Sequence, residues 1–297
     1  MEFSPSAFLS ADRDPTNPPT ADLIILNQPI QDFETLKRIW SHTRYRICAD
    51  GGANRLYHLF SGSLEKHRME FLPNLIHGDL DSLSPSTSDF YSSKGVTISK
   101  DEDQYSTDFG KCMKILTNGY PPDSPYEKPN SIPPSSTTTT DSPSAAAGYH
   151  DIIILSSLAG RVDQGLGLLH ELLRESRRKS HRQEVQNQIQ EDSRPQPPTR
   201  LWLLSEQSLS FLLAPGKSTI KSLSSTAGIF TENIGILPIY GAATISTKGL
   251  EWDVQDWETE MGGMVSTSNH VLGDEVVVVT DRVVLFTVER VRRDGGG

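Results

Sequence analysis

The chain has 297 residues, long enough for two domains, and its 28 Lys and Arg against 38 Asp and Glu give a formal net charge of −10. This acidic balance argues against nucleic acid or an anionic membrane as a partner, and no apolar run is long enough to span a bilayer. Two cysteines are too few for a disulfide framework, and the N-terminus lacks the apolar segment of a signal peptide. We therefore expect a cytoplasmic protein.

The first two thirds of the chain alternate between strand-like and helix-like patterns. We expect residues 1–21 to form a disordered N-terminal tail and residues 22–205 to form an α/β domain. Its predicted strands are the short apolar runs 22–27, 45–49, 74–77, 95–99 and 151–157. Apolar residues at helical spacing follow most of these runs, for example in 33–40, 53–60, 106–116 and 162–173. The alternation predicts a mostly parallel, Rossmann-like sheet flanked by helices.

Two polar stretches interrupt this domain, and the pattern changes after it. Residues 121–148 are rich in Pro, Ser and Thr, and residues 176–199 are polar and charged, so both are expected to be surface insertions. Residues 206–297 contain short β-type runs separated by Gly, Pro and Asp turns. This part is predicted to be a C-terminal all-β sandwich domain.

Carboxylates follow four of the predicted strands. The segments that follow are Asp50-Gly-Gly-Ala-Asn54, Gly78-Asp-Leu-Asp-Ser82, Lys100 to Asp108, and Gly160-Arg-Val-Asp163. Ligands of parallel sheets bind beyond the carboxyl ends of the strands, so these acids are expected along one rim. Clustered carboxylates repel unless a cation lies between them, and a set of oxygen ligands suits Mg²⁺. Together with glycines and Arg161 for phosphates, the pattern predicts magnesium-dependent phosphate transfer.

Each of these features has an alternative interpretation. A single Asp at a strand end often caps a turn or a helix, and Asp108 in a first helical turn interacts favourably with the helix dipole. The Asp79-x-Asp81 pair also resembles the loop of haloacid-dehalogenase-type phosphatases, although it follows a third strand here and Leu83 stands where that family has Thr or Val. A phosphatase with Asp79 as nucleophile is therefore the alternative enzyme.

The predicted β domain carries different side chains. Trp252 lies near a turn, where an exposed indole can stack on a flat or cationic ring, and Ser266-Thr-Ser-Asn269 offers hydroxyl and amide groups. A core tryptophan and an ordinary polar turn are the alternatives.

Six motifs stand in the order and approximate spacing of eukaryotic thiamine pyrophosphokinases, a family that this chain resembles. They are Asp50-Gly-Gly-Ala-Asn54, Gly78-Asp-Leu-Asp-Ser82, Gln104-Tyr-Ser-Thr-Asp108, Gly160-Arg-Val-Asp-Gln164, Gly249-Leu-Glu-Trp252 and Val265-Ser-Thr-Ser-Asn269. The resemblance covers most of residues 22–290 outside the two insertions. The chain departs from the family pattern at Ala159, where another Gly is usual, and at Val283, where Pro is usual.

The resemblance implies transfer of the pyrophosphoryl group of ATP to the hydroxyl of thiamine, giving thiamine diphosphate and AMP. It implies a homodimer with the active site at the subunit interface, ATP and Mg²⁺ on the α/β domain, and thiamine bound with the help of the β domain. A non-catalytic thiamine or nucleotide sensor is the alternative from another class. The general base is not assigned.

The resemblance also implies roles for individual residues. Asp79, Asp81 and Asp108 are the expected catalytic and metal-binding acids. The residues expected on the nucleotide side are Asp50, Asn54, Gln104, Thr107, Arg161 and Asp163. Trp252 is expected to stack on thiamine, and Ser268 and Asn269 are expected to orient it.

Overall fold

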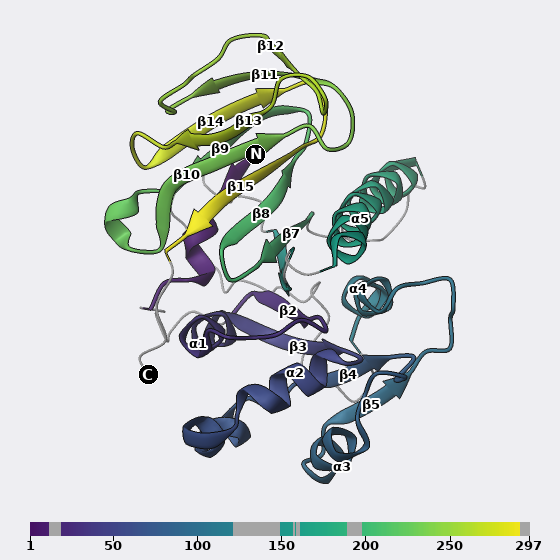
Figure 1. The fold of residues 1–297 in the computed structure, drawn as a ribbon. Coiled ribbons are helices and arrows are strands. Elements are labelled where there is room, and N and C mark those ends of the chain that lie inside the picture. The colour runs from purple at the N-terminus through teal and green to yellow at the C-terminus, as the bar shows by residue number, and fades with distance from the viewer. Residues whose placement is uncertain (12–18, 121–148, 157, 159–160, 189–197, 292–297) are drawn as a thin grey trace, which may run out of the picture. The chain divides into compact units, whose positions relative to one another are not determined.

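The computed structural model describes residues 1–11, 19–120, 149–156, 158, 161–188 and 198–291 (Figure 1). The predicted insertion 121–148 and residues 189–197 of the second predicted insertion lie outside the described residues. The chain divides into two compact units. The α/β unit comprises Pro19–Pro29 and Thr43–Leu201, and the β unit comprises Met1–Pro18, Ile30–His42 and Trp202–Gly297.

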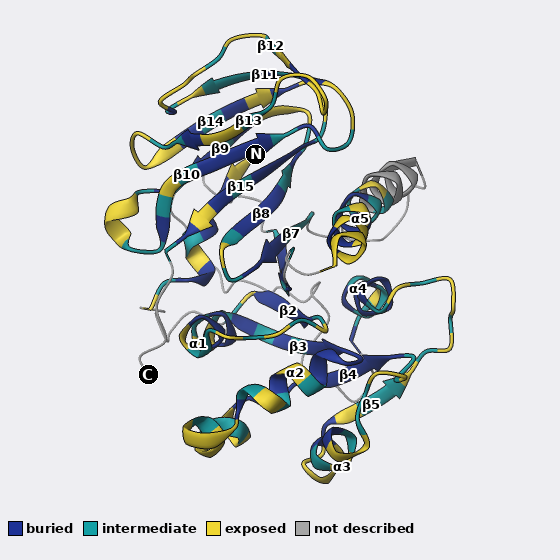
Figure 2. Cartoon of the chain, in the orientation of Figure 1, coloured by how far each residue is buried: buried dark blue, intermediate teal, exposed yellow. Residues whose placement is uncertain are grey.

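The α/β unit is built on a parallel sheet with the strand order β6-β2-β3-β4-β5. These strands are β2 (Ala21–Ile25), β3 (Thr43–Ala49), β4 (Leu75–Gly78), β5 (Thr97–Lys100) and β6 (His150–Leu155). All five residues of β2 are buried, as expected for a parallel strand covered on both faces. Strand β4 is buried throughout, and β3 is buried except at Arg44 and Arg46, which have intermediate exposure (Figure 2). This unit confirms the predicted α/β class with a mostly parallel sheet.

Helices cover both faces of this sheet. They are α2 (Gly52–Leu59), the 3-10 helix η2 (Gly62–Glu70), α3 (Pro85–Ser93), α4 (Asp108–Asn118) and α5 (Val162–Gln188). In Figure 1, α2 and α3 lie on one face, and α4 and α5 lie on the other. The α4 stripe of Phe109, Cys112, Met113 and Leu116 is buried, as the helical spacing predicts. Residues 176–188 of the second predicted insertion extend α5.

The β unit contains two sheets. The first has the order β13-β10-β15-β8-β7, and the second has the order β1-β9-β14-β11-β12. Their bounds are β1 (Glu2–Phe3), β7 (Thr199–Leu204), β8 (Ser208–Leu213), β9 (Gly216–Lys221), β10 (Phe230–Leu237), β11 (Ala243–Lys248), β12 (Trp257–Thr259), β13 (Ser266–His270), β14 (Glu275–Thr280) and β15 (Val284–Arg290). The Phe3 ring of β1 stacks on Phe211 of β8 at 4.9 Å between centroids, which joins the two layers. The predicted C-terminal β-rich domain is confirmed.

Helix α1 (Phe33–His42) follows β2 in sequence but packs within the β unit. Asp32 caps its first turn by accepting the Thr35 N–H at 2.9 Å. The buried Arg290 of β15 donates to the Thr35 hydroxyl and to the Ser205 carbonyl. The Arg38 guanidinium donates to the Leu9 carbonyl at 3.0 Å. These bonds fix α1 to β15 and to the N-terminal segment.

The N-terminal segment differs from the expected disordered tail. Strand β1 pairs in parallel with β9, and residues Pro5–Phe8 form the 3-10 helix η1. Phe3 is 3% exposed, and Phe8 and Leu9 are also buried. The expectation of a disordered tail is therefore wrong for residues 1–11. Isolated apolar residues show no periodicity in the sequence, and the strand forms only because the folded protein offers the edge of β9. Residues 12–18 lie outside the described residues.

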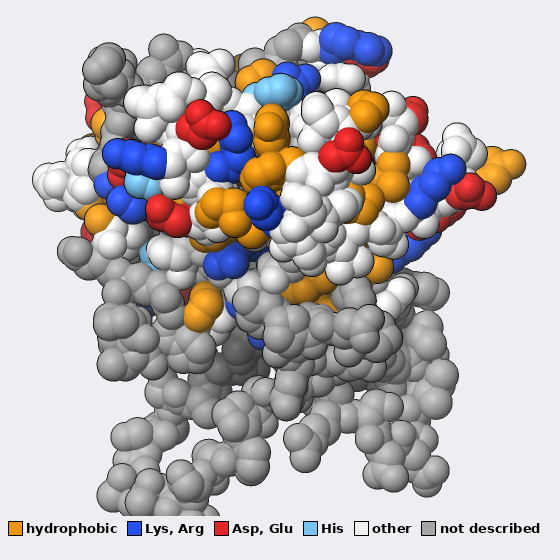
Figure 3. Space-filling view, turned by 90° about the horizontal axis from the view of Figure 1, so that it is seen from below, with side chains coloured by type: hydrophobic (Ala, Val, Ile, Leu, Met, Phe, Trp, Pro, Cys, Tyr) orange, Lys and Arg blue, Asp and Glu red, His pale blue; other side chains and the backbone are white. Residues whose placement is uncertain are grey.

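The described surface shows mixed charge on the face seen in Figure 3, where basic, acidic and apolar side chains are interspersed. Among the helices of the described residues, none combines the length and the apolar character needed to cross a membrane.

Candidate functional site

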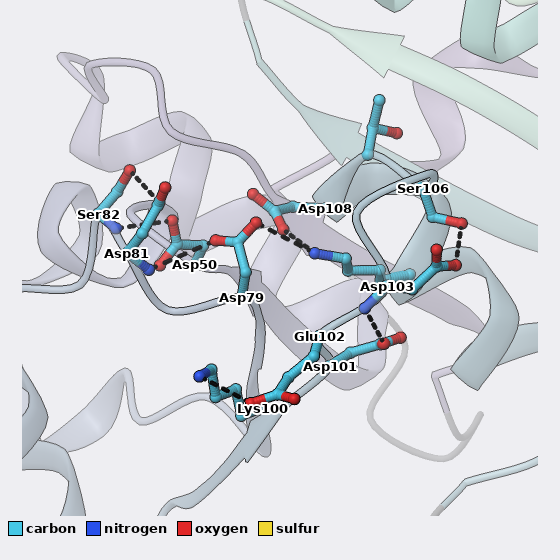
Figure 4. A network of polar contacts seen from close by, with 12 residues as sticks. Asp50, Asp79, Asp81, Ser82, Lys100, Asp101, Glu102, Asp103, Ser106 and Asp108 are labelled. Carbon is cyan, nitrogen blue, oxygen red and sulfur yellow. Dashed lines mark hydrogen bonds and ion pairs between the residues drawn. The ribbon is translucent and has the colours of Figure 1, made fainter.

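Three aspartates converge at the carboxyl end of the parallel sheet (Figure 4). Asp50 follows β3, Asp79 follows β4, and Asp108 begins α4; one oxygen from each lies within 4.8 Å of the others. Gly78 permits this approach, because a Cβ there would lie 2.9 Å from both the Asp108 Oδ1 atom and the Asp50 Cβ atom. Asp50 itself adopts a positive φ of 42°. Three of the expected strand-end acids therefore form a compact cluster.

Asp50 is the buried member of this cluster. Asp50 is 2% exposed, and its Oδ2 atom accepts a hydrogen bond from the Ser82 N–H at 3.1 Å. Its Oδ1 atom is buried without a hydrogen-bond partner among the described residues. Burial raises the pKa of Asp50, the Asp108 charge adds to this rise, and the hydrogen bonds from Ser82 and Gly51 oppose it. One carboxylate oxygen of Asp50 is thus left without a protein donor among the described residues.

Lys111 supplies positive charge to the cluster, a role that was not expected from the sequence. Its ammonium lies 3.2 Å from Asp79 Oδ2 and 3.3 Å from Asp108 Oδ1. Burial raises the pKa of Asp79, but the hydrogen bonds from Lys111 and from the Asp81 N–H outweigh it, so the net pKa is lowered. Burial alone would lower the pKa of Lys111, yet its hydrogen bonds to Asp79 and Asp108 raise it overall. The i,i+3 spacing of Asp108 and Lys111 is the sequence signal that identifies this pair.

Asp81 lies beside the cluster rather than among its three members. Its N–H donates to Asp79 Oδ1 at 3.4 Å, and its own Oδ1 accepts the Ser82 hydroxyl at 3.1 Å. Leu80, between the two acids, has a positive φ of 66°, which turns the loop so that Asp79 and Asp81 point differently. The converging oxygens are thus those of Asp50, Asp79 and Asp108, whereas the predicted metal set has Asp81 in place of Asp50.

Two predicted residues shape the backbone around the cluster. The Asn54 side chain donates to the Ser82 carbonyl at 2.7 Å and accepts the Ser84 N–H at 3.1 Å. The Thr107 hydroxyl caps α4 by accepting the Gly110 N–H at 3.1 Å, which sets Asp108 in the first helical turn. Both side chains therefore hold the loops that carry the acids.

The loop between β5 and α4 presents Gln104 to solvent. Asp103 accepts hydrogen bonds from the Tyr105 N–H, the Ser106 hydroxyl and the Lys114 ammonium, which hold the loop. Figure 4 shows the bond between Asp103 and Ser106. The Lys114 hydrogen bond is the main reason that the pKa of Asp103 lies below its usual range.

Arg161 and Asp163 form an exposed pair at the start of α5. The guanidinium donates to both oxygens of Asp163, at 3.1 and 2.5 Å. This hydrogen bonding lowers the pKa of Asp163. The two side chains pair with each other, and the expected role of Arg161 and Asp163 near phosphates stays a prediction.

The candidate residues of the β unit form a second group. Trp252 is 55% exposed, and Asn269 clamps its backbone by accepting the Trp252 N–H at 3.2 Å and donating to its carbonyl at 3.0 Å. Ser268 is exposed with a positive φ of 55°. Two neighbouring residues were not expected from the sequence: His270 Nδ1 lies 2.5 Å from Glu251 Oε2, and the centroids of the His270 and Trp252 rings are 5.1 Å apart. Asn269 thus positions Trp252 through its backbone.

These features define a class of protein: an α/β unit with strand-end acids together with a β-rich unit bearing an exposed tryptophan. Residues 36–185 match the family model of the thiamin pyrophosphokinase catalytic domain, and residues 217–285 match that of the thiamin pyrophosphokinase vitamin B1 binding domain. The chain belongs to the thiamin pyrophosphokinase family, as its motifs indicate.

Similar proteins cover nearly the whole chain. The thiamine pyrophosphokinase of Saccharomyces cerevisiae is 30% identical over 93% of this chain and 87% of its own length. Thiamine pyrophosphokinase 1 of Oryza sativa subsp. japonica is 29% identical over 94% and 93% of the two chains. The structure of the thiamin pyrophosphokinase from Candida albicans, 25% identical in sequence, superposes with a TM-score of 0.72 over 97% of this chain and 92% of that one.

Proposed function

We propose that this protein transfers the pyrophosphoryl group of ATP to the hydroxyl of thiamine, giving thiamine diphosphate and AMP. The observation that carries the proposal is the convergence of Asp50, Asp79 and Asp108 in a region that matches the family's catalytic domain. The match of residues 217–285 to the family's vitamin B1 binding domain supports thiamine as the acceptor. The relatives named above carry the same activity in their names.

The acidic cluster fits a Mg²⁺ ion. Its ligand set is oxygen only, and the buried Oδ1 of Asp50 has no hydrogen-bond partner among the described residues. Asp50, Asp79 and Asp108 would hold the ion, with Asp81 beside them. When bound, Mg²⁺ would neutralise phosphate charge and make the phosphorus more electrophilic.

The protein's own groups would bind and orient the nucleotide. The first turns of α2 and α4 direct backbone N–H groups toward the carboxyl end of the sheet, where phosphate oxygens are favoured. Gln104 and Thr107 lie on the loop that leads into α4, and Arg161 offers a guanidinium at the start of α5. We propose that these residues contact the nucleotide. The lowered pKa of Asp79 favours the ionised form of that carboxylate.

The Trp252 turn is the proposed platform for thiamine. Its exposed indole offers a face for a flat cationic ring, and Ser268 offers a nearby hydroxyl on β13. Asn269 acts by holding the backbone of Trp252. We expect Trp252→Ala to raise the KM for thiamine roughly tenfold with little change for ATP, whereas Trp252→Phe retains most of the affinity. Equal KM values in all three proteins would exclude this platform.

An assay of products tests the reaction. Purified protein incubated with thiamine, ATP and Mg²⁺ should form AMP and thiamine diphosphate in equal amounts, and no AMP should form when thiamine is omitted. ADP with thiamine monophosphate as the only products would overturn the proposal. Phosphate released from a phosphomonoester without ATP would point instead to the haloacid-dehalogenase-type reaction, and ligand binding without turnover would point to a sensor.

We also propose a cytoplasmic homodimer with its active site at the subunit interface. Light scattering coupled to size-exclusion chromatography should give twice the mass of one chain. Mixing Asp108→Asn with Trp252→Ala, assayed at a thiamine concentration well below the raised KM of the Trp252 variant, should give more activity than either variant alone if each site uses both subunits. A monomeric active enzyme would refute the arrangement.

A further inference from the structure

A lysine is buried inside the acidic cluster. The Lys111 side chain is 1% exposed, and its ammonium contacts Asp79 at 3.2 Å and Asp108 at 3.3 Å. Figure 4 shows the carboxylates of Asp79 and Asp108 turned toward each other. Lys111 therefore bridges two of the three carboxylates that converge at the end of the sheet.

The charges of this cluster do not balance without a further cation. Three carboxylates contribute oxygens within 4.8 Å of one another, and they repel when all are ionised. One ammonium that is hydrogen-bonded to two of them offsets part of this repulsion. A divalent cation bound to the same carboxylates would be repelled by the neighbouring ammonium. Lys111 and a bound metal thus stabilise the same cluster while opposing each other.

We propose that Lys111 is an internal counter-charge of the metal site. It holds Asp79 and Asp108 in place in the metal-free protein. It also weakens the binding of the divalent cation, so that the cation can enter and leave readily together with the nucleotide. This inference rests on the metal site of the proposed function. Lys111 is a positioning residue and not a phosphate ligand, because its buried ammonium would have to leave both carboxylates to reach a phosphate.

The test compares Lys111→Met with Lys114→Met in the absence of nucleotide. Lys114 lies one turn further along α4, is 40% exposed and pairs with Asp103 at 2.8 Å, so its variant is a matched control. Thermal unfolding is measured with and without Mg²⁺. The affinity for Mn²⁺, a spectroscopic substitute for Mg²⁺, is measured by electron paramagnetic resonance.

We expect metal-free Lys111→Met to lose about 5 °C or more in Tm, because removing one partner exposes the others to uncompensated repulsion. Mg²⁺ should restore most of this loss, and Mn²⁺ should bind on the order of tenfold more tightly than in the unaltered protein. Lys111→Arg, which keeps the charge, should retain more of the metal-free Tm than Lys111→Met. Lys114→Met should behave like the unaltered protein in both measurements.

Other results would overturn the inference. A loss in Tm that Mg²⁺ does not restore, with unchanged Mn²⁺ affinity, would mean that Lys111 serves packing alone. Weaker ATP binding with unchanged Mn²⁺ affinity would mean that it contacts phosphate. If Lys111→Met does not fold, the double variant Asp108→Asn/Lys111→Met should fold because it removes one charge of each sign; its failure to fold would also contradict the inference.

The same measurements separate this inference from the proposed metal site. If the unaltered protein shows neither a Tm increase with Mg²⁺ nor Mn²⁺ binding, the metal site itself is wrong. If the unaltered protein binds Mn²⁺ but Lys111→Met binds it no more tightly, the metal site stands and only the role of Lys111 fails.

Discussion

Two buried aspartates of the α/β unit have opposite surroundings. Asp22 on β2 is 0% exposed, and both its oxygens accept the Tyr120 hydroxyl at 2.9 Å. His150 Nε2 lies 2.6 Å from its Oδ2 atom, and the Arg44 guanidinium lies 3.2 Å from its Oδ1 atom. Asp50, just after β3, is buried to a similar degree but leaves one oxygen without a hydrogen-bond partner among the described residues. Burial of an acid alone therefore does not mark a site.

The difference follows from what each carboxylate must do. When the protein supplies every partner of a buried carboxylate, the carboxylate stabilises one conformation. It then has no oxygen left to bind a ligand. A buried carboxylate with a free oxygen next to two others is costly unless a ligand completes it. We therefore propose a structural role for Asp22 and a ligand-binding role for Asp50, Asp79 and Asp108, and substitutions on each side test this division.

The largest expected effect is on turnover at the acidic cluster. Asp108→Asn should lower kcat by roughly a hundredfold or more, because one carboxylate that would hold the metal is lost. Its Tm should change little, since Lys111 keeps Asp79 as a partner. Initial rates of AMP formation and thermal unfolding are the measurements. Asp89→Asn, an exposed substitution on α3, is the control. An active Asp108→Asn enzyme would place the chemistry elsewhere.

The reverse pattern is expected at Asp22. Asp22→Asn should lower the free energy of unfolding by about 3 kcal/mol, because Arg44 and His150 lose the charge that they face inside the protein. The kcat of the folded protein should stay near that of the unaltered enzyme. Urea unfolding and rates per active site measure the two quantities, with Asp89→Asn again as the control. A loss of kcat without a loss of stability would erase the distinction between the two aspartates.

A smaller effect is expected when one donor to Asp22 is removed. Tyr120→Phe deletes a hydroxyl that reaches both oxygens of Asp22, and it should cost about 1–2 kcal/mol in urea unfolding. The ring itself, stacked on Tyr45 at 4.3 Å, remains. Tyr105→Phe, at a fully exposed ring, is the matched control and should have no effect. Equal stability of the two variants would mean that Arg44 and His150 suffice for Asp22.

The sequence predicts the convergence of the acids because it encodes strand ends. Apolar runs mark β3 and β4, and in a parallel sheet the residues after them meet at one edge, so Asp50 and Asp79 are placed together by topology alone. Strand ends do not identify Lys111, which lies on α4. Its i,i+3 spacing indicates a contact with Asp108, but its contact with Asp79 depends on the direction that the side chain takes from α4 into the cluster. Nor do strand ends separate Asp50 from Asp81, which depends on the positive φ of Leu80.

Other features were beyond the sequence for similar reasons. Strand β1 has two residues and forms only because the edge of β9 accepts it. The bonds by which the Asn269 side chain holds the Trp252 backbone are likewise not visible in the sequence, and its expected role in orienting a ligand stays a prediction. Helix α3 has few apolar residues, and its start is fixed by the Ser84 cap rather than by a periodic stripe. Local pattern predicts elements, whereas long-range contacts decide these assignments.

The smallest expected effect concerns His77, which lies on β4 two residues before Asp79. Burial lowers its pKa, although the Ser99 carbonyl at 3.0 Å and Asp101 oppose the shift. Because the folded pKa lies below the usual value of about 6.5, the unfolded chain takes up this proton first as the pH falls. The contribution of His77 to stability is therefore complete above about pH 6.5 and is lost as the pH falls through the folded pKa.

His77→Gln should consequently flatten the dependence of Tm on pH between about pH 7.5 and pH 5. His170→Gln, on the exposed side of α5, should leave the slope unchanged and serves as the control. Identical slopes for His77→Gln and the unaltered protein would mean that the histidine beside the acidic cluster does not differ in pKa between the folded and unfolded chain. Such a result would leave the carboxylates as the groups that set the response to acid at this end of the sheet.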